Sequence, residues 1–183
     1  MKLIFMDTEA NQPSNKTIQI GAVSAELSSV KAEIVSEFDI FVNPQEPLNP
    51  EISELTGIYE EHVRDAPTIK DAWAEFDKWV QAQNARYLLA WGNDFDHLYR
   101  EAGEPTPKNA INIKPFFTMI NANRTNKNQP GGLAANIRAL GLGFQGKQHN
   151  ALDDAKNTWL LFAELVRRHK AYSEIKDFME ETL

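Results

Sequence analysis

Two carboxylic acids occur close together near the start of the chain, in a segment with the pattern of a β-strand. In KLIFMDTEA, Asp7 and Glu9 follow an apolar run. Residues two apart in a strand project from the same face of a sheet, so these carboxylates converge. In a low dielectric they repel each other unless a cation lies between them. The pair predicts a hard divalent cation, Mg²⁺ or Mn²⁺, and the alternative is a strand end that has reached solvent.

A second pair of acids follows the short apolar strand pattern YLLAW. The next residues, GNDFDHL, contain Asp94 and Asp96 at the start of a predicted helix. Acids stabilise helix N-termini, so an N-cap role explains Asp94. Asp96 lies on the first helical turn, near the end of a strand in the sheet that carries the first two acids. We therefore favour Asp96 as the residue with a chemical role.

A histidine precedes the last long helical pattern, which begins with two acids. His149 lies five residues before Asp154 in the stretch HNALDDAKN, and Asp153 is adjacent to that acid. A histidine beside a metal-bound acid can deprotonate a water molecule at neutral pH. His149 is thus a candidate general base, and an incidental surface histidine is the alternative.

Length and composition indicate one globular domain over residues 1–183. The chain has 42% apolar and 25% charged residues and no cysteine, which excludes disulfides, a thiol nucleophile and zinc sites built from thiolates. No stretch approaches the roughly 20 apolar residues of a membrane span, and the start of the chain does not have the pattern of a signal peptide. We expect a cytoplasmic protein without membrane contact.

Charge is unevenly distributed along a chain whose net charge is −7. No Asp or Glu occurs between Glu104 and Asp153, whereas six cations do: Lys108, Lys114, Arg124, Lys127, Arg138 and Lys147. This pattern predicts a surface that contacts phosphates, with Lys114 and Arg124 as binding candidates. The alternative is an Asn-rich, poorly ordered loop over residues 121 to 131.

Hydrophobic periodicity predicts the element order β β β α β α β α α. Three strands over 2–10, 16–27 and 33–44 favour an antiparallel meander. The remaining elements are expected as a helix in 65–83 capped by Asp65, a strand at 87–92, a helix at 93–103 closed by Gly103, a strand running into a helix at 110–120, and helices at 132–142 and 153–170.

The three acidic motifs together resemble those of the DEDDh 3′→5′ exonucleases, the DnaQ-like group. The stretches IQIGAV, FVNP and ELTGI between them are also similar, and the resemblance covers about residues 1 to 168. The WGN and LDDAKNT stretches resemble the Eri-1-like and KapD-like enzymes and a bacterial and phage group of exoribonuclease-like proteins. The resemblance implies an α/β, ribonuclease H-like fold with a central mixed five-stranded sheet flanked by helices.

The resemblance also implies roles for five residues. His149 is the general base, and two Mg²⁺ or Mn²⁺ ions, which support in-line hydrolysis, are held by Asp7, Glu9, Asp96 and Asp154. Asp94 and Asp153 replace their neighbours if the alignment slips. We prefer Asp96 because the family's acid follows an aromatic or large apolar residue, and Asp154 because its spacing from the histidine matches the family.

The implied partner is the 3′ end of single-stranded nucleic acid, RNA rather than DNA. The expected substrate-binding residues are Ala10, Thr56, Gly57, Ile58, Lys114 and Arg124. Alternatives are a DNA proofreading or repair exonuclease, a catalytically silent nucleic-acid-binding module, and a protein with a structural metal. A silent module is expected to lack at least one of the five motif residues, and none is lost. A homodimer is compatible with the sequence.

Overall fold

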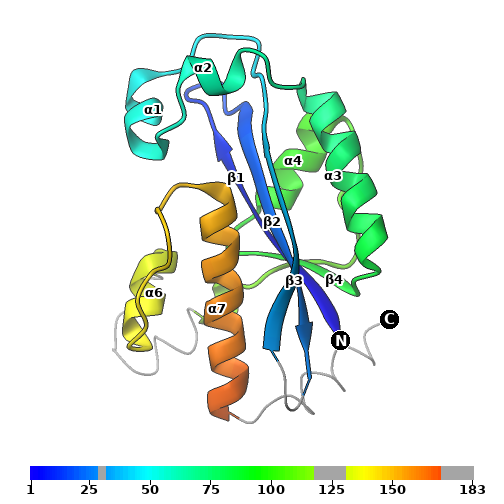
Figure 1. The fold of residues 1–183 in the computed structure, drawn as a ribbon, viewed down its shortest axis with the longest axis vertical. Coiled ribbons are helices and arrows are strands. Elements are labelled where there is room, and N and C mark those ends of the chain that lie inside the picture. The colour runs from blue at the N-terminus through cyan, green and yellow to red at the C-terminus, as the bar shows by residue number, and fades with distance from the viewer. Residues whose placement is uncertain (29–31, 118–130, 170–183) are drawn as a thin grey trace.

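A computed structural model of the chain describes residues 1–28, 32–117 and 131–169 (Figure 1). Its centre is one five-stranded sheet with the strand order β3-β2-β1-β4-β5. The strands are β1 (Lys2–Ala10), β2 (Thr17–Leu27), β3 (Ala32–Phe41), β4 (Tyr87–Ala90) and β5 (Ala110–Asn112). The first three pair antiparallel, and β4 and β5 run parallel to β1. The predicted meander and mixed sheet are therefore confirmed.

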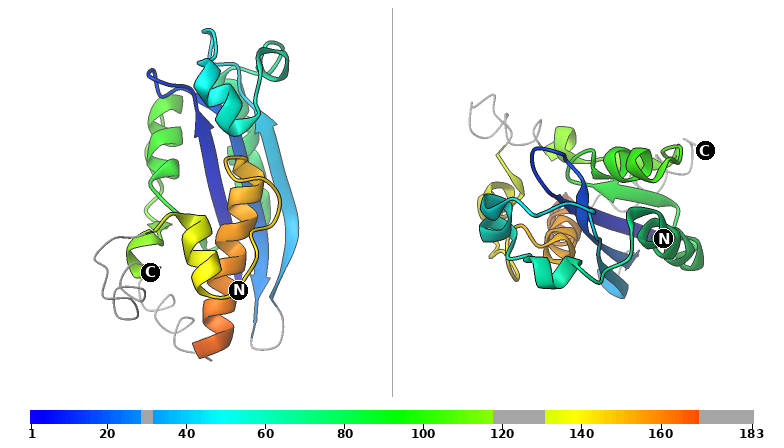
Figure 2. Two further views of the ribbon diagram at one scale, coloured as in Figure 1. Left: turned by 90° about the vertical axis from the view of Figure 1, so that its left-hand side faces the viewer. Right: turned by 90° about the horizontal axis from the view of Figure 1, so that it is seen from above.

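Helices cover both faces of the sheet and one of its ends. They are α1 (Pro50–Thr56), α2 (Glu60–Val63), α3 (Ile69–Gln83), α4 (Asp94–Ala102), α6 (Leu133–Ala139) and α7 (Ala151–His169). Figure 1 shows α6 and α7 on one face of the sheet and α3 and α4 on the other. Helices α1 and α2 lie beyond the end at which β1 finishes (Figure 2). In the described part of the chain, no helix has both the length and the apolar character needed to cross a membrane.

The alternation along β1 divides its side chains between two cores. Leu3 and Phe5 belong to the cluster beneath α6 and α7, whereas Ile4 and Met6 belong to the cluster beneath α3 and α4. A central strand that is buried on both faces has this continuous apolar sequence. Because successive side chains alternate, Asp7 continues the row of Leu3 and Phe5 and projects toward the side of α7.

Two helix starts differ by two or more residues from those expected from sequence. Asp65 does not cap a helix, because α3 begins only at Ile69, with Thr68 as its N-cap residue. Residues 67–68 instead bond to the end of the β-meander, where the Asn43 N–H donates to Pro67 O over 2.9 Å, and this keeps the backbone extended. At the other end of the chain, α7 begins at Ala151, two residues before the expected start.

The predicted end of one helix and the predicted start of one strand hold. Gly103 ends α4 in the left-handed conformation with a φ of 82°. The strand predicted after residue 110 is β5, and it leads into a helical stretch over residues 114–117. The predicted poorly ordered segment, 121 to 131, lies outside the described residues except for its last position.

Candidate active site

A direct backbone contact places the start of α7 against β2. A Cβ on Gly21 would lie 2.1 Å from the Leu152 backbone nitrogen, so any larger residue would push the helix away. The Ala151 N–H also donates to Oε1 of the buried Gln19 over 3.0 Å. Gly21 pairs with Asp7 in the register of the two strands. The first turn of α7 therefore lies immediately beside the acidic end of β1.

The loop before α7 is held by a buried amide. Asn157 is fully buried, accepts a hydrogen bond from the Gln145 N–H over 2.9 Å, and donates to Gln145 O and Asp153 O. The Asp153 carboxylate accepts from the Lys147 N–H over 2.8 Å, and a Cβ on Gly146 would lie 2.3 Å from that carboxylate. Asp153 thus stabilises the loop, which leaves Asp154 to face the end of β1.

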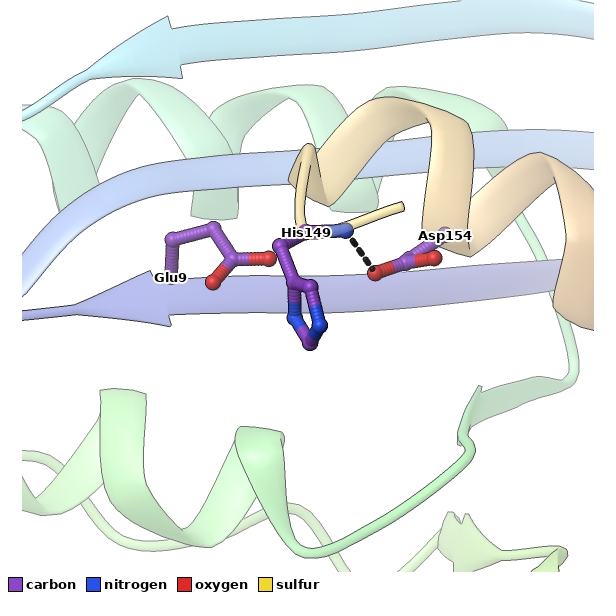
Figure 3. Close-up of side chains that lie close together, drawn as sticks. All are labelled: Glu9, His149 and Asp154. Carbon is purple, nitrogen blue, oxygen red and sulfur yellow. Dashed lines mark hydrogen bonds between the residues drawn. The ribbon is translucent and has the colours of Figure 1, made fainter. Parts of the chain in front are cut away.

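The structure brings His149 together with two of the predicted acids. Figure 3 shows the histidine between Glu9 and Asp154. One candidate ligand atom from each of these three residues lies within 4.8 Å of the others. His149 adopts a φ of 61°, and its backbone N–H donates to Asp154 Oδ2 over 3.1 Å. Its backbone is therefore fixed while the residue remains exposed to solvent.

Helix α4 contributes Asp94 to the same group of acids. The Thr8 hydroxyl on β1 donates to Asp94 Oδ1 over 3.4 Å. The charge of Asp94 raises the pKa of Asp7, Glu9 and Asp154, which places it close to all three. The structure does not bring the expected Asp96 into this group, because its Oδ1 accepts a hydrogen bond from the Thr106 hydroxyl over 2.8 Å instead. Of the two acids in the first turn of α4, Asp94 is the one that lies with the other carboxyls.

Burial and mutual repulsion make this group of carboxyls unusually basic. Removal from water raises the pKa of Asp7 well above its ordinary value, and the charges of Asp94, Asp154 and Glu9 raise it further. Burial, and then the charges of Asp154 and Asp94, raise the pKa of Glu9 to about 8. Burial, together with the charges of Asp153 and Asp94, raises the pKa of Asp154 to about 6, although the hydrogen bond from the His149 N–H lowers it. Burial also raises the pKa of Asp94.

A group of acids with these properties is suited to divalent cations. The negative charges of these acids repel one another. The atoms available to hold a metal are carboxylate oxygens together with one imidazole. Mg²⁺ and Mn²⁺ prefer oxygen ligands, and imidazole is also a ligand for first-row transition metals. The residues present therefore fit the cofactor that the sequence predicted.

Three of the expected substrate-binding residues form the turn that ends α1. Thr56 and Ile58 are buried, and the Thr56 hydroxyl donates to Ile52 O and accepts from the Ile58 N–H. Gly57 has a φ of 73° and ends the helix in the left-handed conformation. The side chains of Thr56 and Ile58 are therefore packed inside the protein, and only the backbone around Gly57 is left to contact a ligand.

The other expected substrate-binding residues are scattered around the site. Ala10 ends β1 at a register shift, where it pairs with Thr17. Lys114 follows β5, and its N–H donates to Oδ1 of Asn112, whose amide in turn donates to Asn93 just before α4. Arg124 lies outside the described residues.

One residue near the site was not singled out from the sequence. In the sequence, Lys147 is only one of six cations in the acid-free stretch. In the structure, its Nζ donates to Thr56 O over 2.8 Å. The two residues are separated by 91 positions, so no local pattern relates them.

Comparison with known proteins establishes the family. The RNase T exonuclease family model matches residues 4–162, which is most of the chain. The chain therefore belongs to this exonuclease family, and the resemblance to the DEDDh, DnaQ-like 3′–5′ exonucleases is confirmed.

Relatives in sequence include proteins of two kinds. A DNA polymerase III PolC-type of Staphylococcus haemolyticus is 29% identical over 176 residues, which cover 91% of this chain and 11% of the polymerase. The human ERI1 exoribonuclease 2 is 29% identical over 181 residues, which cover 84% of this chain and 26% of that protein. The chain thus spans only a small part of the length of these relatives.

Solved structures of nucleases share the fold. The nuclease domain of 3′hExo, a DEDDh family member bound to rAMP, aligns with a TM-score of 0.74 at 21% identity and covers 91% of this chain and 92% of that chain. Cell-death related nuclease 4 aligns with a TM-score of 0.76 at 17% identity, with 91% and 64% covered. Exonuclease X in complex with 5′ overhanging duplex DNA aligns with a TM-score of 0.62 at 22% identity and covers 91% of this chain and 92% of that chain.

Proposed function

We propose that the chain removes nucleotides from the 3′ end of single-stranded nucleic acid, RNA in preference to DNA, by metal-dependent hydrolysis of the phosphodiester bond. One observation carries the proposal: four carboxyls from three separate elements converge beside a histidine, and three of them have pKa values raised by the charges of the others. These residues are Asp7, Glu9, Asp94, Asp154 and His149.

In this proposal, two Mg²⁺ or Mn²⁺ ions are held by the four carboxyls, with Asp94 in place of Asp96. Bound ions of this kind lower the pKa of the attacking water and stabilise charge on the scissile phosphate and the leaving 3′ oxygen. The pKa of Asp7 is raised by all three other acids, so Asp7 would be a ligand at the centre of this group. Glu9 and Asp154 lie on the side of His149.

His149 accepts the proton of the attacking water. Its backbone N–H is bonded to Asp154, so the ring is attached to a fixed point beside the acids. The exposed ring can move between the water and bulk solvent, which allows the proton to leave after each turnover. The turn around Gly57 contacts the terminal nucleotide, while Lys114 and Arg124 contact the phosphates on the 5′ side of that nucleotide.

The preference for RNA is supported by the exoribonuclease relative and by the solved relative bound to rAMP. The PolC-type relative and the duplex DNA complex of Exonuclease X favour the second candidate, a DNA proofreading or repair exonuclease. Single-stranded RNA and DNA of one sequence, labelled at the 5′ end, distinguish the two when incubated with Mg²⁺, Mn²⁺ or EDTA.

The expected result is a ladder of products shortened from the 3′ end, faster for RNA and absent in EDTA. A 3′-phosphorylated oligonucleotide of the same sequence serves as the control for attack at the free 3′ end. Faster cleavage of DNA would favour the second candidate, and binding without cleavage in either metal would favour the silent module.

We also propose that the chain acts as a single exonuclease domain over residues 1–183 in the cytoplasm, with a homodimer as one candidate assembly. Light scattering coupled to size-exclusion chromatography measures the mass directly and decides between monomer and dimer. A fluorescent fusion followed in the native cell tests the location.

A further inference from the structure

We propose that Lys147 is a positioning residue that ties the His149 loop to the turn Thr56–Ile58, so that the general base and the nucleotide-binding turn keep a fixed relative position. This inference rests on the proposed function for its consequence in catalysis. The tether itself rests on contacts that are independent of any activity.

The side chain of Lys147 reaches across to the end of α1. Its Nζ donates to Thr56 O over 2.8 Å, at the carbonyl end of the helix, where a positive charge is favoured by the helix dipole. A Cβ placed on Gly57 would lie 2.0 Å from this Nζ. The absence of a side chain at Gly57 therefore serves two purposes, because it permits the φ of 73° and leaves room for the ammonium group.

The backbone of Lys147 is held from the opposite side. Its N–H donates to Asp153 Oδ2 over 2.8 Å, on the first turn of α7. Gly146 makes this approach possible, since a Cβ there would lie 2.3 Å from the Asp153 carboxylate. Lys147 thus joins α7 through its backbone and α1 through its side chain, and Figures 1 and 2 show α1 next to the loop that precedes α7.

His149 follows Lys147 by two residues and is fixed to the same helix turn. Its N–H bonds to Asp154, as the N–H of Lys147 bonds to Asp153. Without the contact to Thr56, the loop retains its anchors on α7 but loses its connection to the turn that contacts the substrate. The histidine and the terminal nucleotide then vary in relative position, and errors of about 1 Å in such positioning can slow a reaction by about 10²-fold.

The test compares Lys147→Met and Lys147→Arg with the wild-type chain on 5′-labelled single-stranded RNA. Lys147→Met keeps an unbranched, slightly shorter side chain and removes the charge and the hydrogen-bond donor, so we expect kcat to fall about 10-fold or more with KM changed less than about 3-fold. Lys147→Arg retains a donor for Thr56 O and should recover most of kcat. Lys156→Met is the matched control, because this lysine of α7 bonds to Glu37 at the surface.

Hydrogen–deuterium exchange gives a second readout that needs no activity. Lys147→Met should speed amide exchange both in residues 145–149 and in residues 56–58, whereas Lys156→Met should leave both segments unchanged. Unchanged exchange in Lys147→Met would overturn the tether. A rise in KM with kcat unaltered would also overturn it, because Lys147 would then bind substrate directly. If the wild-type chain cleaves nothing, the proposed function fails while the exchange experiment still tests the tether.

Discussion

The hydroxyl of Thr8 donates a hydrogen bond to Asp94 Oδ1 over 3.4 Å, which connects the middle of the acidic tripeptide on β1 to the first turn of α4. Thr8 is the residue between the two acids of β1, and it points to the opposite face of the strand from them. Through this contact, Asp94 lies near the end of β1, close to Asp7 and Glu9 on the other face of the strand. Of the two acids in the first turn of α4, the contact joins Asp94 and not Asp96 to β1.

Replacement of Asp94 should disable the site, whereas replacement of Asp96 should not. Asp94→Asn removes a charge that acts on three other acids, so we expect Mn²⁺ affinity to fall and the rate of RNA cleavage to drop by about 10² or more. Asp96→Asn keeps an oxygen that can accept from the Thr106 hydroxyl and loses only a charge outside the group, so it should stay within about 3-fold of the wild-type rate.

Calorimetric titration with Mn²⁺ and a cleavage assay on the same preparations measure both effects. The two variants are matched controls for each other, since each removes one charge from the first turn of α4. The assignment of Asp94 would be wrong if Asp96→Asn lost metal affinity and activity while Asp94→Asn kept them.

Without metal, the acidic group should make folding stability fall as pH rises. The pKa of Glu9 is raised from 4.5 to about 8 and that of Asp154 from 3.8 to about 6. At a pH between the ordinary and the raised pKa of each acid, the folded protein holds a proton that the unfolded chain has released, so a higher pH favours unfolding. Each pKa unit corresponds to about 1.4 kcal/mol, so in EDTA we expect a melting temperature at least about 5 °C lower at pH 8 than at pH 5.

Glu9→Gln is the control for this pH dependence, because the amide does not titrate over this range. The difference between pH 5 and pH 8 should shrink in that variant. In the wild-type chain, saturating Mg²⁺ or Mn²⁺ should raise the melting temperature more at pH 8 than at pH 5, since protons compete with the ions for the carboxylates. Identical pH curves for Glu9→Gln and the wild type in EDTA would show that other groups cause the effect.

The sheet could be predicted from sequence because its central strand has a pattern that only one environment explains. Leu3 to Met6 are apolar without interruption, as expected for a strand between two helical layers, and Asp7 and Glu9 continue one row of that strand. Their convergence follows from the two-residue period alone. No knowledge of distant contacts was needed for this part of the site.

The choice between Asp94 and Asp96 could not be made in the same way. Side chains two residues apart on a helix point about 200° away from each other, so only one of these two acids faces the site. Which one does so depends on where the helix begins and on the contacts to Thr8 and Thr106, which lie 86 and 10 residues away from their partners. The resemblance favoured Asp96 because it follows an aromatic residue, but that neighbour does not settle the orientation of the helix.

Gly21 is expected to be the glycine on which the geometry of the site depends most. Gly21→Ala would place a methyl group 2.1 Å from the backbone nitrogen of Leu152, so α7 must shift away from β2. Overpacking of this kind costs about 1–3 kcal/mol or more, and the shift should also weaken Mn²⁺ binding because Asp154 moves with the helix. Chemical denaturation and metal titration measure the two effects.

Gly143→Ala is the matched control. A Cβ on Gly143 meets nothing within 4 Å, and its φ is not in the left-handed region, so the variant should be within about 0.5 kcal/mol of the wild type and bind metal normally. If Gly21→Ala matched this control in both measurements, α7 would not depend on the close approach to β2.

Lys114 should contribute to substrate affinity through charge. It follows β5, close to the asparagine pair that links β5 to the start of α4, at the edge of the acid-free stretch. Lys114→Glu should weaken binding of single-stranded RNA and reduce the slope of log affinity against log salt by about one unit. Lys78→Glu, an equal charge change at an exposed position of α3, should leave the slope unaltered. Equal slopes for both variants would make the stretch an ordinary solvated surface.

The last prediction concerns His149, which supplies proton transfer and no negative charge to the site. If it is the general base, its removal should leave the four carboxyls and their affinity for Mn²⁺ intact, while kcat falls by roughly 10² to 10⁴ and KM changes little. Replacement by alanine alone is ambiguous, because the φ of 61° disfavours most residues and a shift of the backbone would disturb the bond to Asp154.

His149→Asn resolves this ambiguity, because asparagine tolerates the left-handed conformation but does not act as a base near neutral pH. We expect His149→Asn to keep the wild-type melting temperature and Mn²⁺ affinity and to lose as much of kcat as His149→Ala does. A much smaller loss in the asparagine variant would show that the backbone position at residue 149 is what matters. A loss of Mn²⁺ affinity in both variants would instead make the imidazole a metal ligand, which its distance from Glu9 and Asp154 also permits.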